Sequence, residues 1–568
     1  MEEPKKLSPN ETLKEKSGYL RGTIAESLDS ASSAFGKDDN LLLKFHGSYQ
    51  QDDRDRRQQL LKDKQEPAYS MMVRTKVPGG KLTAEQYLVH DEMASLYGNG
   101  TLRITNRQGI QFHGILKKNM RAVMRAVNEK LVTTSGACGD IVRNVMGCTV
   151  PVRDRTQLEI FRYAKAVSDQ FLSRSGAYQE IWLNGEKVDF GAKPMEEVEP
   201  IYGKTYLPRK FKIGICYPDD NSTDVYAQDL GIVPEVDAKG GLTGFNILVG
   251  GGFGTTHGVK TTYPRLGSPL CFVKPEDLLE ITKAVVLVQR DNGNRADRKQ
   301  ARMKYLIDKM GLDWFRAEVE KRFGRKTEPA HAIRISGIHN YHGWHEQLDG
   351  RFYYGIFIEN GRVKDEGTFR LKTALRTLVE TYKPEVYLTG QQDAVLSGFK
   401  AEDRSGVEAL LTAHGVKLPH QISSVRRDSM ACPALPTCGL AITESERALP
   451  GIMDELEKVS ASLGLDQQKF IIRMTGCPNG CARPYNAELA FIGRTVGTYD
   501  IHAGGNLIGD RLAKPVAEKV PHAELIGRLT PLFTAYRDER TQGEGFGDFC
   551  HRVGTDRVKA LLTPALHA

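Results

Sequence analysis

Cys432-Pro-Ala-Leu-Pro-Thr-Cys438 and, further along the chain, Cys477-Pro-Asn-Gly-Cys481 hold four of the nine cysteines in this 568-residue sequence. Cysteine thiolates are soft ligands that suit zinc ions or iron–sulfur clusters. Zinc sites often leave about two residues between paired cysteines, whereas five and three residues separate these pairs. The wider spacing favours a larger object such as a four-iron cluster, with a structural zinc site or four unreactive thiols as the alternatives. We therefore predict that all four bind metal: Cys432, Cys438, Cys477 and Cys481.

The composition around these motifs is that of an ordinary globular protein, with 40% hydrophobic and 26% charged residues. A chain of this length is expected to form about two to four domains. No apolar run approaches the roughly 20 residues that a membrane-spanning helix needs. The first residues, Met1-Glu-Glu-Pro-Lys-Lys6, lack the apolar core of a signal peptide. We therefore expect a cytoplasmic protein that does not enter a membrane.

The net charge is +8, from 79 basic and 71 acidic residues. This balance suits nucleic acid, acidic proteins and anionic small molecules alike. The basic residues that stand out are isolated ones in apolar segments, as in Arg103-Ile-Thr-Asn-Arg107 and Leu207-Pro-Arg-Lys-Phe-Lys212. Nucleic-acid-binding arms more often contain runs of like charge. The pattern favours an enclosed anionic ligand, and a zinc-bound nucleic-acid-binding protein is the alternative from a different class.

The chain also contains a weak internal repeat. Residues 105–114 align with residues 389–398, with Thr, Gln and Gly at the same offsets, and residues 245–251 align with residues 499–505. Two similarities in the same order predict a duplicated unit. Helical spacing over residues 450–463, with a proline in the first turn, occurs beside short strand-like runs. The expected fold class is therefore α+β.

The two cysteine pairs resemble the signature of the siroheme-dependent sulfite and nitrite reductases. Residues from about Lys44 to the C-terminus are similar to the same family. In that family the four thiolates carry a 4Fe–4S cluster, and the last of them, Cys481 here, also bridges to the siroheme iron. The resemblance therefore implies siroheme and a 4Fe-4S cluster as cofactors, held in a pseudo-twofold duplicated fold.

The resemblance also implies a domain layout. Residues 1–70 would form an N-terminal arm, partly flexible, that serves partner binding or assembly. Residues 71–135 plus 340–418 would form a duplicated ferredoxin-like unit. Two larger mixed α/β domains would surround the siroheme, the first over residues 136–339 and the second, which bears the cluster, over residues 419–568.

Reduction of an oxyanion needs cations that hold its oxygens and proton donors that remove them as water. Four positions match the family's anion pocket and are the predicted catalytic residues: Arg74, Arg143, Lys210 and Lys212. Side chains two apart in an extended strand share one face, so the two lysines can reach one ligand while Phe211 faces a core. Taken alone, Lys-Phe-Lys is more typical of a solvated surface strand.

Siroheme carries many carboxylates, which need cations of their own. The positions that match macrocycle contacts in the family are Arg103, Arg107, Gln111, Arg209 and Asn479, together with the bridging Cys481. His113 is a tempting iron ligand, but a lone histidine beside an aromatic residue is more often a hydrogen-bonded core residue. Because the family's axial ligand is a cysteine, we reject His113 in that role.

The resemblance implies six-electron reduction of sulfite to sulfide, with nitrite reduction to ammonia as the alternative. Nitrite reductases of the family tend to have Asn at the position of Lys212, so this lysine favours sulfite. No flavin or nicotinamide site is evident, because Gly250-Gly-Gly-Phe-Gly254 lacks the helix that a Rossmann motif requires. Electrons should therefore come from a partner protein. We expect an NADPH-dependent flavoprotein subunit in preference to a ferredoxin, and this partner could form a hetero-oligomer with the chain.

Tyr49 and Cys138 form a further candidate pair. Some family members join a tyrosine and a cysteine covalently at similar positions near the active site. The hypothesis is that Tyr49 and Cys138 approach each other near the siroheme, and the alternative is a buried, unreactive Cys138.

Overall fold

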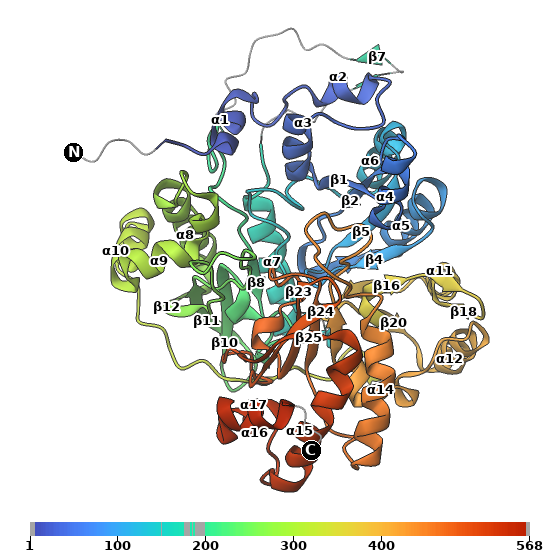
Figure 1. The fold of residues 1–568 in the computed structure, drawn as a ribbon. Coiled ribbons are helices and arrows are strands. Elements are labelled where there is room, and N and C mark those ends of the chain that lie inside the picture. The colour runs from blue at the N-terminus through green and yellow to red at the C-terminus, as the bar shows by residue number, and fades with distance from the viewer. Residues whose placement is uncertain (1–5, 149, 175–181, 184–185, 188–198, 564–568) are drawn as a thin grey trace.

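The computed structural model describes residues 6–148, 150–174, 182–183, 186–187 and 199–563 (Figure 1). Within these residues, three five-stranded sheets and one four-stranded sheet form the framework, accompanied by short two-stranded ribbons. Some residues of the first α/β domain predicted over 136–339 lie outside the described ranges. The mixture of helices and largely antiparallel sheets agrees with the expected α+β class.

Two of the five-stranded sheets are copies of one pattern. Their strand orders are β1-β2-β5-β4-β16 and β14-β15-β20-β19-β3. Each copy contributes one short strand to the other sheet, because β3 and β16 have exchanged places. The first-half strands are β1 Ser48–Asp52, β2 Tyr69–Arg74, β3 Lys81–Leu82, β4 Leu102–Ile104 and β5 Ile110–Ile115. The second-half strands are β14 Gly343–Glu346, β15 Phe352–Ile356, β16 Arg362–Val363, β19 Glu385–Leu388 and β20 Ala394–Phe399.

The first predicted repeat is the tight turn that leads into β5 and β20. Gln108 and Gln392 both adopt positive φ angles, 55° and 77°. The backbone N–H of Thr105 donates to the Gly109 carbonyl at 2.9 Å, and that of Thr389 donates to the Asp393 carbonyl at 2.9 Å. Identical turns at matching places in the two sheets confirm this part of the predicted duplication.

The other two large sheets also correspond. In one, β8 (Ile213–Ile215) pairs in parallel with β10 (Leu230–Val236), which continues antiparallel to β11 (Leu242–Val249) and β12 (Ser268–Val273). In the other, β21 (Ser429–Ala431) and β22 (Ile472–Thr475) lead to β23 (Leu489–Thr495), β24 (Thr498–Ala503) and β25 (Lys514–Pro521).

The second predicted repeat covers the end of β11 and the end of β24, together with the two glycines that follow each strand. Gly250 and Gly504 both have positive φ angles, 82° and 94°. A Cβ atom on Gly251 would lie 2.3 Å from the Gln228 carbonyl oxygen, and one on Gly505 would lie 2.3 Å from the Ala487 carbonyl oxygen. Only glycine fits either place, so the second repeat is confirmed as well.

Helices cover the sheets on the outside (Figure 1). The helix predicted over residues 450–463 is α14, with its proline in the first turn, where no N–H is needed. The ferredoxin-like copies carry α5 Ala84–Tyr97, α6 Met120–Glu129, α11 Leu371–Tyr382 and α12 Arg404–Ala413. The first α/β unit carries α7 Arg155–Gln170, α8 Leu278–Asn292, α9 Met303–Met310 and α10 Leu312–Phe323. The second carries α13 Ser424–Arg427, α14 Leu449–Ser462, α15 Leu525–Glu539, α16 Phe546–Val553 and α17 Thr555–Leu562.

The described part of the N-terminal arm packs on the body. It contains α1 Pro9–Lys16, α2 Ile24–Asp29, α3 Lys37–Leu42, β1 and α4 Arg54–Lys62. The Lys14 side chain is 1% exposed and donates to the Leu207 carbonyl at 2.9 Å. Because β1 is the edge strand of the first sheet, the segment predicted as an arm also completes the fold. The domain bounds themselves stay a prediction.

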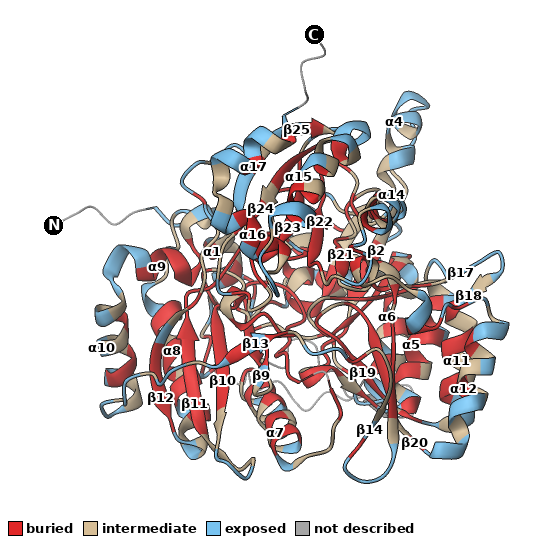
Figure 2. Cartoon of the chain, turned by 90° about the horizontal axis from the view of Figure 1, so that it is seen from below, coloured by how far each residue is buried: buried red, intermediate tan, exposed pale blue. Residues whose placement is uncertain are grey.

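Buried apolar side chains gather in two main clusters, one drawn from residues 20–418 and the other from residues 425–562. Figure 2 shows that the buried residues concentrate in the strands and in the inner faces of the helices. None of the helices among the described residues has both the length and the apolar character that crossing a membrane requires.

Candidate active site

The four predicted metal ligands open onto one pocket. Cys432 follows β21 and Cys477 follows β22, while Cys438 and Cys481 lie in the loops beyond. The pocket lining is Cys432, Pro433, Ala434, Cys438, Leu440, Ala441, Thr475, Gly476, Cys477, Asn479 and Cys481. Four thiols that share a pocket in this way suit a multi-iron cluster.

The electrostatics of these thiols agree with that assignment. Burial and the neighbouring Cys481 thiolate raise the pKa of Cys477 to about 11. The same two causes, burial and Cys481, raise the pKa of Cys432 still further. The thiolates therefore repel one another, and a bound cation would relieve this repulsion while it keeps them deprotonated. The four residues fit the metal cluster that the sequence predicts.

The two predicted catalytic lysines flank Phe211, which is 1% exposed. The strand β8 begins only at Ile213, so the lysines precede the strand instead of lying within it. Phe211 forms a bridge with Val142, and the Arg143 backbone N–H donates to the Phe211 carbonyl at 2.9 Å. These bonds keep the segment extended, and Lys210 lies close enough to Lys212 to lower the pKa of Lys212.

An excess of positive charge defines this part of the site. Burial, Arg209 and Arg143 lower the pKa of Lys210 to about 7. Burial, Lys210 and Arg107 hold the pKa of Lys212 well below its ordinary value. Buried cations that repel one another are costly unless an anion joins them. The environment of this segment therefore differs from that of a solvated surface strand, and the anion site stays a prediction.

The predicted catalytic arginines lie beside the same site. Arg74 ends β2, and its Nη1 donates to the Cys138 thiol at 2.9 Å. With the Gln111 amide oxygen turned towards Arg74, that oxygen lies 3.0 Å from Arg74 Nε. Arg143 interacts electrostatically with Tyr49 and Cys138. The four predicted catalytic residues therefore come from β2, the segment before β8 and the loop that carries Arg143.

Tyr49 and Cys138 do approach each other. Burial and the Cys138 thiolate raise the pKa of Tyr49 to about 12, while Arg74 donates to the same sulfur. The covalent bond between them stays a prediction. Its formation would remove two hydrogen atoms, so the intact mass should fall by that amount and digestion should give a joined peptide. Alkylation of Cys138 in the denatured protein would contradict it.

The residues predicted to contact the macrocycle have several protein partners already. Arg103 is 2% exposed, and its Nη2 donates to the Ala431 carbonyl at 2.8 Å. Arg107 Nη1 donates to Gln228 Oε1 at 2.6 Å. Arg209 is 3.7 Å from Asp140. These contacts hold the guanidinium groups in place. Burial and Arg143 lower the pKa of Arg107 to about 9.

Two further residues support a fit to a carboxylate-rich cofactor. Asn479 Nδ2 donates to the Cys477 sulfur at 3.5 Å, which holds the amide at the rim of the four-cysteine pocket. His113 is 2% exposed, and within the described chain neither ring nitrogen has a hydrogen-bond partner. Burial and Arg362 hold its pKa well below the ordinary value. His113 is thus buried, as expected, but it lacks the hydrogen bond expected of a core histidine, which leaves a polar group that a ligand could satisfy.

Sequence reasoning missed two cations at this site. Arg302 forms a bidentate pair with Asp229, with both distances at 2.9 Å. Lys304 Nζ donates to the carbonyls of Gly252 and Gly254 at 3.0 and 3.1 Å, and burial and Arg302 lower its pKa to about 6. Their sequence signal was two cations at the start of a half-buried helix. The glycine-rich loop that Lys304 holds also touches the cysteine loop, because Thr255 donates to the Pro478 carbonyl.

Among the described residues, only one copy of the duplicated unit gathers cations in this way. Ile213 pairs with Leu230, and Ile472 pairs with Leu489 at the matching place. This register sets Lys210 against Lys469 and Lys212 against Ile471. Lys469 donates to the Ile338 carbonyl at 2.7 Å. The second copy thus retains one lysine, with a protein partner, and is not a second anion site of the same kind.

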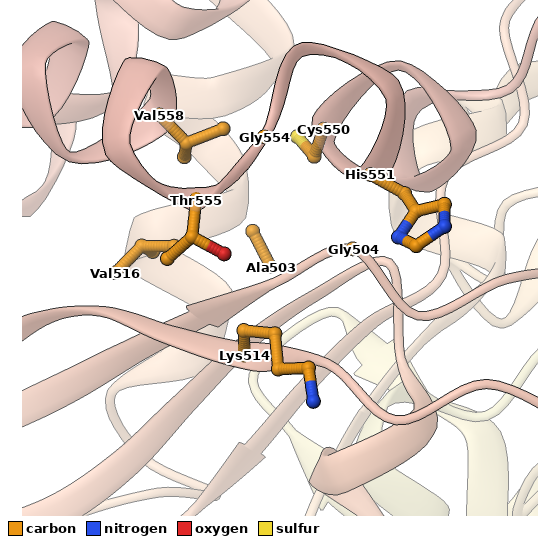
Figure 3. Close-up of a pocket in the computed structure, with 9 residues that line it drawn as sticks. All are labelled: Ala503, Gly504, Lys514, Val516, Cys550, His551, Gly554, Thr555 and Val558. Atoms are coloured by element: carbon orange, nitrogen blue, oxygen red, sulfur yellow. The ribbon is translucent and has the colours of Figure 1, made fainter.

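A separate pocket of about 210 Å³ lies between β25 and the helices α16 and α17 (Figure 3). None of the predicted site residues lines it. Its one thiol, Cys550, is 4% exposed, and burial raises its pKa far above the ordinary value. A protonated, buried thiol is unreactive, so this pocket does not extend the site described above.

Two models of known protein families match this chain. The model of the nitrite and sulphite reductase 4Fe-4S domain matches residues 163–327 and 423–567. The model of the nitrite/sulfite reductase ferredoxin-like half domain matches residues 63–130 and 345–414. The chain belongs to the nitrite and sulfite reductase family. This assignment confirms the expected family, duplicated fold and cofactors, and it replaces the zinc-bound nucleic-acid-binding alternative.

Individual proteins with similar sequences or structures give a more specific comparison. The chain is 46% identical over 99% of its length to the sulfite reductase (NADPH) hemoprotein beta-component of Methylobacterium nodulans, 93% of which is covered. It is 44% identical over 99% of its length to the sulfite reductase (ferredoxin) of Synechococcus elongatus, 92% of which is covered. Among solved structures, the NirA protein of Mycobacterium tuberculosis shares the fold, with a TM-score of 0.79, 24% identity and 98% of both chains covered.

Proposed function

We propose that this chain reduces sulfite to sulfide at a siroheme that Cys481 couples to a 4Fe–4S cluster. The observation that carries the proposal is the excess of buried and half-buried cations beside the four-cysteine pocket. In the described part of the chain, the carboxylates that face this group of cations are Asp140, Asp229 and Asp308. The cations of the group are Arg74, Arg107, Arg143, Arg209, Lys210, Lys212, Arg302 and Lys304.

The proposed roles follow from side-chain chemistry. Arg74 and Arg143 carry permanent charge in planar forks, which suits them to hold oxyanion oxygens. Lys210, with a pKa of about 7, can give and regain a proton near neutral pH. Lys212 adds a second tunable amine. Together these four residues would bind sulfite and deliver the protons with which its oxygens leave as water.

The cofactor residues complete the proposal. When bound, siroheme and its cluster would supply the iron that binds the sulfur and the electrons that reduce it. The four cysteines would hold the cluster. The macrocycle carboxylates would meet the residues that match family contacts: Arg103, Arg107, Gln111, Arg209 and Asn479.

The electron donor is proposed from the named relatives. We favour an NADPH-dependent flavoprotein partner over ferredoxin, because most of the similar proteins are named as hemoprotein beta-components of NADPH sulfite reductase. The two proteins would form a hetero-oligomer. A relative named for ferredoxin is almost as similar, so direct comparison of the two donors decides the point. A cytoplasmic setting fits, because a reducing compartment keeps cysteine thiols available for a cluster.

The test is purification under cofactor-replete conditions. The protein should be coloured, with a reduced-porphyrin spectrum and about four non-heme irons for each heme iron. With a dithionite-reduced dye as donor, it should convert sulfite to sulfide. A colourless, zinc-containing protein would overturn the proposal.

Replacement of Lys212 by asparagine should distinguish sulfite from nitrite. Sulfite can carry two negative charges and nitrite carries one, so loss of this cation should weaken sulfite reduction more. A hydrogen bond to a charged group is worth about 1.5–3 kcal/mol, which corresponds to a fall of about tenfold to a hundredfold in kcat/KM for sulfite. The control is Lys204→Asn, an exposed lysine on the same segment. Equal losses with both substrates would count against the charge argument.

A further inference from the structure

The helix α4 projects from the body beside the cysteine loop. It connects β1 to β2, and none of its residues is buried; Figure 2 shows it extending from the molecule. Its first turn is nevertheless firmly anchored. The Asp53 carboxylate accepts the Asp55 and Arg56 backbone N–H groups at 3.0 and 3.4 Å, and Asp55 pairs with Arg447 at 2.6 Å. The base of the helix thus has a defined position.

Arg54 makes the contact between α4 and the cysteine loop. Its Nη1 donates to the Cys438 carbonyl at 2.9 Å and to the Ala441 carbonyl at 2.6 Å. Its backbone N–H donates to the Pro436 carbonyl at 3.2 Å. Residues 433–441 form neither helix nor strand; within this loop the Ala441 backbone N–H donates to the Cys438 carbonyl at 3.2 Å, and Arg54 adds the bonds from outside it. One residue therefore ties three carbonyls around a cluster ligand to the first sheet.

We propose that Arg54 is a positioning residue that sets the reduction potential of the cluster. Cluster potentials depend on nearby charge and on the hydrogen bonding around the ligands. Reduction adds one negative charge, so a permanent guanidinium charge beside Cys438 stabilises the reduced cluster more than the oxidised one. The two side-chain bonds hold this charge and the Cys438 backbone in a fixed relation. The inference rests on the proposed function, because it requires the cluster.

The experiment is a redox titration of the cluster followed by electron paramagnetic resonance, without sulfite. In the purified holoenzyme, Arg54→Gln should shift the midpoint potential to a more negative value, while the iron content and siroheme spectrum stay the same. The matched control is Arg56→Gln, which removes the same charge from the same turn. Arg56 is exposed, and its side chain has no partner among the described residues. The cluster of the Arg56→Gln variant should therefore have the same midpoint potential as that of the unmodified protein.

The outcomes separate the two proposals. An unchanged potential in Arg54→Gln, or an equal shift in Arg56→Gln, overturns the role of Arg54. Absence of a cluster from the unmodified protein overturns the proposed function instead. If Arg54→Gln loses the cluster, Arg54→Lys decides, because a shorter amine cannot bond both carbonyls in the same way. A smaller shift in the same direction supports the inference, and a potential equal to that of the unmodified protein overturns it.

Discussion

Replacement of Cys481 by serine is expected to abolish sulfite reduction. Iron–sulfur clusters and siroheme iron require a soft thiolate, and a serine oxygen is a hard, protonated group at neutral pH. Cys481 lies at the mouth of the four-cysteine pocket, and the Asn106 side chain donates to its carbonyl. As the proposed bridge, it should affect both cofactors at once. We expect loss of the coupled visible spectrum, loss of cluster iron and activity below detection with a dye donor.

The control for this variant is Cys550→Ala. Cys550 is buried in the second α/β unit and lines the separate pocket in Figure 3. This variant should lose some stability, as large-to-small core changes do, but it should keep its colour and its turnover. If Cys481→Ser retains the spectrum and activity of the unmodified protein, Cys481 is not the bridge between the cofactors.

Replacement of Asp224 by asparagine is expected to cost about 3–5 kcal/mol of folding free energy, because it leaves buried cations unpaired. Asp224 Oδ2 pairs with Arg473 at 2.9 Å and also with Arg483, and all three side chains are at most 6% exposed. Arg483 Nη1 and Nη2 donate to the carbonyls of Asn106 and Gly390, both at 2.7 Å. These carbonyls belong to the matching turns of the two ferredoxin-like copies. The network thus ties the duplicated halves together next to Cys481.

The measurement is urea unfolding of Asp224→Asn beside Asp556→Asn, whose carboxylate is fully exposed. Burial alone would raise the pKa of Asp224, but Arg473 and Arg483 hold it below its ordinary value. A carboxyl with a lowered pKa stabilises the fold above its ordinary pKa, and the contribution is lost in acid. The difference in the free energy of unfolding between Asp224→Asn and the unmodified protein should therefore become smaller as the pH falls through the range in which carboxyl groups titrate. Equal unfolding midpoints for the two variants would contradict this account.

Local sequence reasoning succeeded where the signal depends on residue type and spacing. The repeated turns around Gln108 and Gln392 were detectable because positive φ angles, at the glutamines and at Gly114 and Gly398, restrict the residues allowed there. The four cysteines were detectable because few other functions group thiols in this way. The paired lysines were detectable only by resemblance, because Lys-Phe-Lys alone does not distinguish a buried site from a surface strand.

Other features depend on contacts between distant segments. Arg302 and Lys304 carry no motif, and their place at the site comes from bonds to Asp229 and the Gly252–Gly254 loop. The N-terminal arm reads as polar and flexible, yet Lys14 is buried by contacts with Leu207 and Glu11. The Leu207 carbonyl is far from Lys14 in the sequence, so local composition cannot predict that this lysine is buried.

The sequence by itself determined the ligand chemistry, the duplication and the α+β class, because thiol spacing and turn residues act over a few positions. Only the tertiary structure decided which charges are compensated. It brings the isolated cations of one copy together with few carboxylates, and it gives Lys469 of the other copy a backbone partner. It also joins Arg54 to the loop of Cys438. The physical reason is that desolvation and charge repulsion depend on distances in space, which are set only when the whole chain has folded.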